Sequence, residues 1–205
     1  MDPALVLRAA AIAVAAFFIG GIPWGVIVAR LAGGPDPRTI GSGRTGGANV
    51  MRALGPRLAL VSGLLDMLKG TAAVLLARLL GAGIEVEVLA GLAAIVGHSR
   101  SPFLGFSGGR GVSAAFGAAL VLAPQAAVVL LVVFLVVLAV TRYTSLASLV
   151  AAAVGGVTLA LQVIFTGQPP ALLLFAIVGP ALIWLFHIDN IGRLLRGEER
   201  KFGAK

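Results

Sequence analysis

A glycine-rich segment at residues 41–52 contains residue types that bind anions. It combines Gly41 and Gly43 with Ser42, Asn49 and Arg52. Glycines let a loop expose successive backbone N–H groups, Ser and Asn add side-chain donors, and Arg can form two parallel hydrogen bonds to phosphate. The segment therefore predicts a phosphate-binding loop. A flexible linker with basic residues explains the same pattern about equally well.

A second glycine-rich segment lies at residues 97–111. Gly108, Gly109 and Arg110 come directly before an apolar stretch, and a glycine turn that leads into a helix N-terminus is an anion-binding arrangement. The segment lacks the Gly-Lys-Ser/Thr ending of a nucleotide-binding P-loop, so nucleotide hydrolysis is not indicated. His98 stands at its beginning, either as a catalytic group or as an interfacial histidine bonded to a loop carbonyl.

A third polar group follows the last apolar stretch. His187, Asn190 and Arg193 are spaced by three residues and would share one broad face of a helix. A basic tail that touches anionic lipid explains the later arginines, but it does not explain a His and an Asn at this position. Ser145 begins another apolar stretch, where a serine more often bonds the backbone of its own helix.

One apolar stretch contains charges. Asp66 and Lys69 are three residues apart, a spacing that permits an ion pair on one face of a helix. A structural pair and a substrate-binding lysine are equally good explanations, because a charge inside a bilayer needs either a partner or a function.

Composition indicates a membrane protein. Of the 205 residues, 59% are hydrophobic and 12% charged, whereas soluble domains have about 25% charged residues. This excludes a soluble globular domain, a disordered chain and a nucleic-acid-binding module, although the net charge is +8. The absence of cysteine excludes disulfides and thiolate sites. With two histidines and scattered acids, no metal site or cofactor is predicted.

The apolar stretches predict an all-α integral membrane protein with about seven transmembrane helices. Charge-free stretches at 111–141 and 143–188 each exceed the roughly 20 residues of one span, so each must fold back. Pro124 divides the first, and residues 166–170 divide the second. The expected spans are 4–29, 58–80, 86–97, 112–122, 125–140, 146–165 and 171–186.

The basic residues predict an orientation. Seven spans would place thirteen of the sixteen Lys and Arg residues, including Lys205, on the side of the C-terminus, with Arg8 and Arg78 on the other side and Lys69 within a span. Because cytoplasmic loops are enriched in Lys and Arg, we expect a cytoplasmic C-terminus and an outside N-terminus. The chain is then one polytopic domain, 1–205, with cytoplasmic loops at 30–57, 98–111 and 141–145 and a basic tail at 187–205.

The ordered polar motifs resemble those of the bacterial acyl-phosphate-dependent glycerol-3-phosphate acyltransferases. The matching segments are 41–52, 65–70, 97–112, 142–148 and 187–201, so the resemblance covers nearly the whole chain. Three residues depart from the usual pattern: Arg44 replaces Asn, Ala48 replaces Thr and Arg110 replaces Lys. Arginine keeps the charge of lysine but differs from it in geometry.

The resemblance implies an enzyme of phospholipid synthesis in the bacterial cytoplasmic (inner) membrane, with its active site facing the cytoplasm. It would transfer a fatty acyl group from acyl phosphate to the 1-hydroxyl of glycerol 3-phosphate, giving 1-acylglycerol 3-phosphate and phosphate. Its partners would be these substrates, membrane lipid and an enzyme that produces acyl phosphate, with no cofactor, metal or nucleic acid.

The resemblance also implies roles for the residues. The acyl-phosphate phosphoryl group would be bound by Gly41, Ser42, Gly43 and Asn49. Glycerol 3-phosphate would be bound by Arg52, Arg110 and Ser145. Reacting groups would be oriented or polarised by His98, His187 and Asn190, which with Ser42 form the expected catalytic set. Further substrate-binding residues would be Lys69, Gly108, Gly109 and Arg193. Either His98 or the leaving phosphate would accept the proton.

Two other functions fit a basic membrane face. One is a transporter or channel for a phosphorylated metabolite or anion. It is disfavoured because Asp66 and Lys69 are the only charges in the interior of a predicted span, away from its ends, and no repeated halves are visible. The other is a non-catalytic scaffold that binds anionic lipid.

Overall fold

The structure, a computed structural model, describes residues 2–203, and this range is helical without β-strands. The longer helices are α1 (Pro3–Gly21), α4 (Pro56–Leu79), α5 (Ile84–Ser99), α6 (Val112–Leu122), α7 (Pro124–Thr141), α8 (Thr144–Thr166) and α9 (Leu172–Phe186). Short helices α2 (Trp24–Leu31), α3 (Gly47–Leu54) and α10 (Ile188–Leu195) and the 3₁₀ turns η1 (Pro37–Thr39) and η2 (Pro102–Leu104) complete the fold. Residues 1, 204 and 205, the last two of which belong to the predicted tail, lie outside the described range.

Each of the seven predicted apolar segments is helical. By length and composition, four helical segments can cross a membrane: Pro3–Leu31, α4, α7 and α8. The pair α9–α10, bent by 63°, makes a fifth if it counts as one span. α6 has only 11 residues, about 16 Å of helix. The structure therefore supports a multi-pass membrane protein, while the count of seven spans stays a prediction.

The first predicted span is broken near its end. α1 stops at Gly21 and α2 begins at Trp24, because Pro23 has no N–H for a helical hydrogen bond and disfavours helical geometry at Ile22. The carbonyl of Ile22 instead accepts a 2.7 Å hydrogen bond from Nζ of Lys69 on α4. Beyond the break, α2 packs on α3 and α4.

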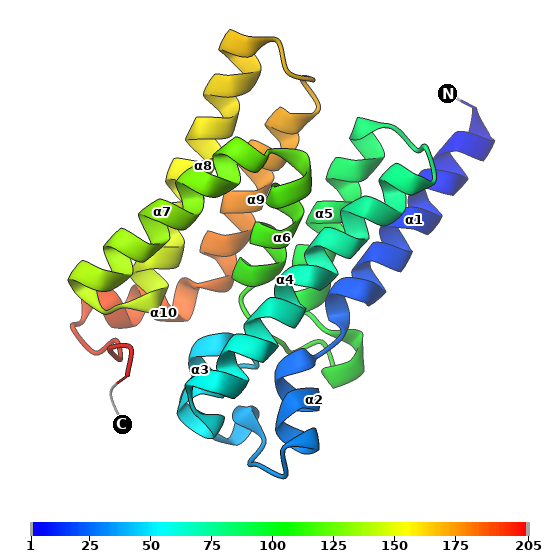
Figure 1. The fold of residues 1–205 in the computed structure, drawn as a ribbon. Helices are drawn as coiled ribbons and strands as arrows, with labels where there is room; N and C mark the ends of the chain where they lie inside the picture. Colours follow the sequence, from blue (N-terminus) through cyan, green and yellow to red (C-terminus); the bar gives the residue numbers. More distant parts are fainter. Residues whose placement is uncertain (1, 204–205) are drawn as a thin grey trace.

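The helices form two groups joined by α6 and by direct packing of α5 on α9 (Figure 1). α4 packs on α1 and α5, α8 packs on α7 and α9, and α6 contacts α4, α5, α7 and α9. α2, α3 and α10 lie at the end of the molecule where the described chain finishes, while the N-terminus lies at the opposite end. The three polar segments singled out in the sequence are thereby brought to the same end.

Glycines allow the close crossing of α4 and α6. A Cβ added to Gly70 of α4 would overlap the backbone of Ala114, and one added to Gly117 of α6 would overlap the backbone of Met67. Between apolar helices, where water supplies no driving force, such close backbone contact is a main source of association. The α4–α6 crossing fixes one wall of the site described below.

Gly117→Ala should destabilise the protein, because the new methyl group meets main-chain atoms that cannot move aside. The expected cost is about 1–3 kcal/mol, as for other overpacked cores. Gly179→Ala is the matched control: Gly179 is also buried in an apolar helix, but its nearest neighbour would be 4.0 Å away. Thermal unfolding in detergent measures both variants. Equal midpoints would contradict the packing argument.

Candidate active site

A cavity of about 700 Å³ lies between the polar loops and helices α4, α6, α7 and α8. Most of the predicted site residues line it: Gly41, Ser42, Asn49, Arg52, His98, Arg110, Ser145, His187, Asn190 and Arg193. The predicted site residues that do not line the cavity are Gly43, Lys69, Gly108 and Gly109. Residues far apart in the sequence therefore meet at one polar pocket.

Asn49 holds the first glycine-rich loop in shape. Its Nδ2 donates to the carbonyls of Ile40 and Arg44, both at 2.8 Å, and its Oδ1 accepts from the N–H of Ser42 at 3.3 Å. Gly41 has φ +59°, and a Cβ there would overlap Oδ1 of Asn49. The buried amide thus organises the loop, whereas the exposed Ser42 hydroxyl has no hydrogen-bond partner among residues 2–203.

The polar end of the cavity is strongly basic. Five arginines line it, Arg44, Arg52, Arg110, Arg193 and Arg200, together with the two carboxylates Asp66 and Glu199. Burial, then the positive charges of Arg44 and Arg193, lowers the pKa of Arg110 to about 10. Arg110 remains protonated at neutral pH, so a bound anion would relieve repulsion among these cations.

Glu199 connects three predicted residues but was not itself predicted as a site residue. Its Oε1 accepts hydrogen bonds from Oγ of Ser145 at 3.0 Å and Nδ2 of Asn190 at 2.7 Å. Its Oε2 accepts from Nε of Arg193 at 2.8 Å. The signals in the sequence are its place in the matching segment 187–201 and its acidic character within a basic tail. The carboxylate fixes Ser145 and Asn190 relative to each other across α8 and α10.

The C-terminal end of α9 supplies two further groups. Nδ1 of the buried His187 donates to the carbonyl of Ile183 at 2.8 Å, because a carbonyl can only accept. This leaves Nε2 of His187 as the ring nitrogen available to a ligand. Arg110 donates from Nη1 to the carbonyl of Phe186 at 2.9 Å, which ties the second glycine-rich loop to α9.

Lys69 forms a structural pair behind the cavity. Its Nζ lies 2.8 Å from Oδ1 of Asp66, and both side chains are 3% exposed. The same Asp66 oxygen is 3.5 Å from Nδ1 of His98. Asp66 and His98 reach the cavity wall, but Lys69 does not. The geometry favours the ion-pair explanation of Lys69, and its substrate-binding role stays a prediction.

The second glycine-rich loop packs against His98. The N–H of Gly109 donates to the carbonyl of His98 at 3.1 Å. A Cβ on Gly108 would overlap that carbonyl, and one on Gly109 would overlap Nε2 of the His98 ring. The two glycines therefore provide space for His98. Of the three consecutive residues 108–110, Arg110 is the one that lines the cavity. Among residues 2–203, no three His, Cys, Asp or Glu side chains gather as a metal site requires.

The other end of the cavity is an apolar groove. Its walls include Leu60, Leu64 and Met67 of α4, Phe116 of α6, and Leu130, Leu131, Phe134 and Leu138 of α7. Leu60 is 64% exposed, Leu64 46% and Leu131 39%. In a bilayer these side chains would face lipid, so the groove is open to the hydrocarbon region.

Comparisons with known proteins agree with this geometry. A family model described as "Glycerol-3-phosphate acyltransferase" matches residues 10–197. The glycerol-3-phosphate acyltransferase of Rubrobacter xylanophilus is 44% identical over 92% of each chain, and that of Sinorhizobium fredii is 42% identical over 92% of this chain and 90% of the relative.

Solved structures share the fold. The crystal structure of PlsY (YgiH), an integral membrane glycerol 3-phosphate acyltransferase, in its glycerol 3-phosphate form superposes with a TM-score of 0.86 at 38% identity, covering 96% of each chain. Its lysophosphatidic acid form gives a TM-score of 0.85 at 37% identity over the same shares. The family matches over most of the sequence, and the fold matches over nearly all of it, so the chain belongs to the glycerol-3-phosphate acyltransferase family.

Proposed function

We propose that this protein is an integral membrane enzyme that acylates glycerol 3-phosphate at its 1-hydroxyl, with acyl phosphate as donor, giving 1-acylglycerol 3-phosphate and phosphate. One observation carries the proposal: a single cavity joins a cluster of arginines to an apolar groove open to lipid. Such a cavity suits substrates that combine a phosphate with a fatty chain. The related structures are described as glycerol 3-phosphate and lysophosphatidic acid forms, which supports the acceptor and the product.

The arginine cluster suits a reaction between two anions. At 4 Å, two like unit charges repel by about 1 kcal/mol in water and by about 4 kcal/mol near a protein surface. Five arginines against two carboxylates leave an excess of positive charge at the polar end. This excess would offset the repulsion between the two phosphate groups and hold them close together.

Acyl phosphate needs little further activation by the protein. Phosphate is a good leaving group, so the glycerol hydroxyl can attack the acyl carbonyl directly without an acyl-enzyme. Ser42 and the loop backbone would bind the donor phosphoryl group, and Arg52 and Arg110 would bind the acceptor phosphate. Asn190, held by Glu199, and Nε2 of His187 would orient the reacting groups.

The proton of the attacking hydroxyl would pass to the leaving phosphate. His98 is a poor candidate for the base, because Asp66 faces Nδ1 of its ring and Gly109 abuts Nε2. We therefore assign His98 a positioning role next to Arg110.

The proposed location is the bacterial inner membrane with the polar end of the cavity in the cytoplasm. Seven spans would then leave the N-terminus outside and the C-terminal tail inside. The loops at 30–57, 98–111 and 141–145 and the tail from residue 187 would form the cytoplasmic face. An acyl-phosphate-producing enzyme is the partner that this donor requires.

The deciding experiment supplies palmitoyl phosphate and glycerol 3-phosphate to purified protein in lipid nanodiscs, without metal, and measures lysophosphatidic acid and phosphate. Acyl-CoA and acyl carrier protein are tested in parallel. Product from acyl phosphate alone supports the proposal, and product from acyl-CoA overturns the donor. If a folded preparation gives no product with any donor, anion transport becomes the better hypothesis, and flux in proteoliposomes tests it. Sealed inside-out vesicles should consume external glycerol 3-phosphate, whereas right-side-out vesicles should not.

Ser42→Ala should lower kcat/KM by about 10- to 100-fold, since a hydrogen bond to a charged group contributes about 1.5–3 kcal/mol. Ser107→Ala is the control, because Ser107 donates to the carbonyl of Leu104 and does not line the cavity. Steady-state kinetics with acyl phosphate measures both. A stable acyl group trapped on Ser42 would instead refute direct transfer.

Arg110→Gln should raise the KM for glycerol 3-phosphate by about 10- to 100-fold through loss of a charge-assisted contact. Arg110→Lys should restore most of the affinity, because it restores the charge. Arg100→Gln is a matched control: Arg100 lies 5.6 Å from the ring of Phe186, near the same loop but outside the cavity lining. Similar KM increases in Arg110→Gln and Arg100→Gln would argue against a specific phosphate contact.

His98→Gln should keep the shape of the pH profile of kcat/KM, with a loss smaller than the roughly 10²–10⁴-fold contribution of general acid–base catalysis. If His98 were the base, the pH profile of kcat/KM would change shape. Wild-type kcat/KM would fall at low pH as His98 becomes protonated, and this fall would be absent in the variant.

A further inference from the structure

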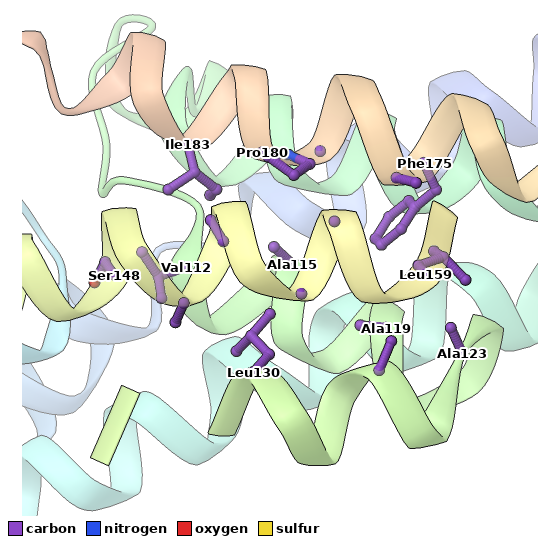
Figure 2. Close-up of a pocket in the computed structure, with 17 residues that line it drawn as sticks. Val112, Ala115, Ala119, Ala123, Leu130, Ser148, Leu159, Phe175, Pro180 and Ile183 are labelled. Atoms are coloured by element: carbon purple, nitrogen blue, oxygen red, sulfur yellow. The ribbon is translucent and has the colours of Figure 1, made fainter. Parts of the chain in front are cut away.

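A second, small cavity lies next to the apolar groove, among α6, α7, α8 and α9 (Figure 2). Its volume is about 50 Å³, and its walls are mainly alanines and glycines with Leu159, Phe175 and Ile183. Apart from Ser148 at its edge, the lining is apolar. Such a space can accept hydrocarbon but offers little to water or an anion.

The small cavity continues the groove away from the polar end. Val112, Leu130 and Ser148 line both spaces. On α7, the groove runs from Leu138 to Leu130, and the small cavity runs from Leu130 to Ala123. α8 shows the same order, because Ser145 lines only the groove and Gly155 lines only the small cavity.

Leu130 separates the two spaces. It points from α7 toward α8 (Figure 2), and a Cβ built on Gly155 would lie 3.1 Å from both Cβ and Cδ1 of Leu130. The leucine side chain therefore packs on Gly155, where α8 carries no side chain. A smaller residue at 130 would join the groove to the small cavity.

The groove leads from the arginines toward this leucine. Leu138 and Leu130 are eight residues apart, about 12 Å of helix, which is within the roughly 15 Å depth of one bilayer leaflet. A chain whose phosphate lies among the arginines would therefore run along α7 and meet Leu130.

We infer that Leu130, packed on Gly155, forms the end of the acyl-chain site and sets the longest acyl chain that the enzyme accepts. This inference rests on the proposed acyltransferase function. The small cavity behind Leu130 becomes part of the acyl-chain site when residue 130 is small.

The test measures kcat/KM for a series of acyl phosphates from dodecanoyl to eicosanoyl phosphate, in steps of two carbons. For the wild type, kcat/KM should fall once the acyl chain exceeds a particular length. Leu130→Ala should move that limit by at least two carbons, with a gain of about fourfold for each further CH₂ buried. The KM for glycerol 3-phosphate should stay unchanged, because Leu130 lies at the far end of the groove from the arginines.

Two further variants should shift the chain-length limit in the direction opposite to Leu130→Ala. Gly155→Ala should favour shorter chains, since its methyl group would push Leu130 into the groove. Adding Ala152→Leu to Leu130→Ala should restore the wild-type limit, because Ala152 lines the small cavity. Leu135→Ala is the matched control: Leu135 is on α7 and 53% exposed, and it lines neither space, so the chain-length profile should not change.

The outcomes separate the two proposals. If wild type makes no lysophosphatidic acid from any donor, the proposed function fails. If product forms but Leu130→Ala and Gly155→Ala both keep the wild-type chain-length profile, only the role of Leu130 is refuted. The same holds if Leu135→Ala shifts the profile as much as Leu130→Ala. If Leu130→Ala fails to fold, the chain-length profiles of Leu130→Val and Gly155→Ala provide the test instead.

Discussion

A charged side chain in a low-dielectric interior must be paired, hydrogen-bonded or directed toward a ligand, and this constraint accounts for the arrangement of the polar groups here. Asp66 and Lys69 form an ion pair inside α4, and Lys69 also donates to the carbonyl of Ile22 at the break before Pro23. The same Asp66 faces His98. One buried pair thus connects α4, the end of α1 and the second glycine-rich loop.

Some of the cations that line the cavity have no acidic partner among residues 2–203: Arg52, Arg110 and Arg200. Arg193 is paired with Glu199, and Arg44 lies 3.3 Å from Asp189. Within the described residues the Arg110 side chain hydrogen-bonds only to the carbonyl of Phe186, and its lowered pKa reflects both its burial and its neighbouring arginines. Holding such charges together is unfavourable without an anion. Two bound phosphate groups would neutralise these positive charges, and relief of the repulsion between the arginines would favour substrate binding.

Close helix packing provides the apolar half of the cavity. Gly70 and Gly117 let α4 and α6 approach closely, so that α6 forms the floor between α4 and α7. Gly155 has another effect on α8. Because it has no side chain, Leu130 can pack directly against this part of the helix. Small residues therefore fix both the tight contact between helices and the open volume beside it. A lipid substrate needs both, since its headgroup must be held still while its chain remains in hydrocarbon.

Local sequence determined which segments are helices and which residue types could bind phosphate. Apolar runs and proline breaks act over a few residues, so the seven helical segments could be predicted within a few positions. The sequence also predicted that Ser42, Arg110 and Asn190 lie at the same end of the molecule, because an even number of predicted spans separates their segments.

Tertiary structure alone decided how each group is used. It directed the amide of Asn49 into its own loop, placed Lys69 behind the cavity, turned Gly108 and Gly109 toward His98 and brought Glu199 between Ser145 and Asn190. It also placed Leu130 opposite Gly155. These outcomes depend on contacts between residues distant in the sequence, and the local pattern of residue types carries no information about which distant atoms meet.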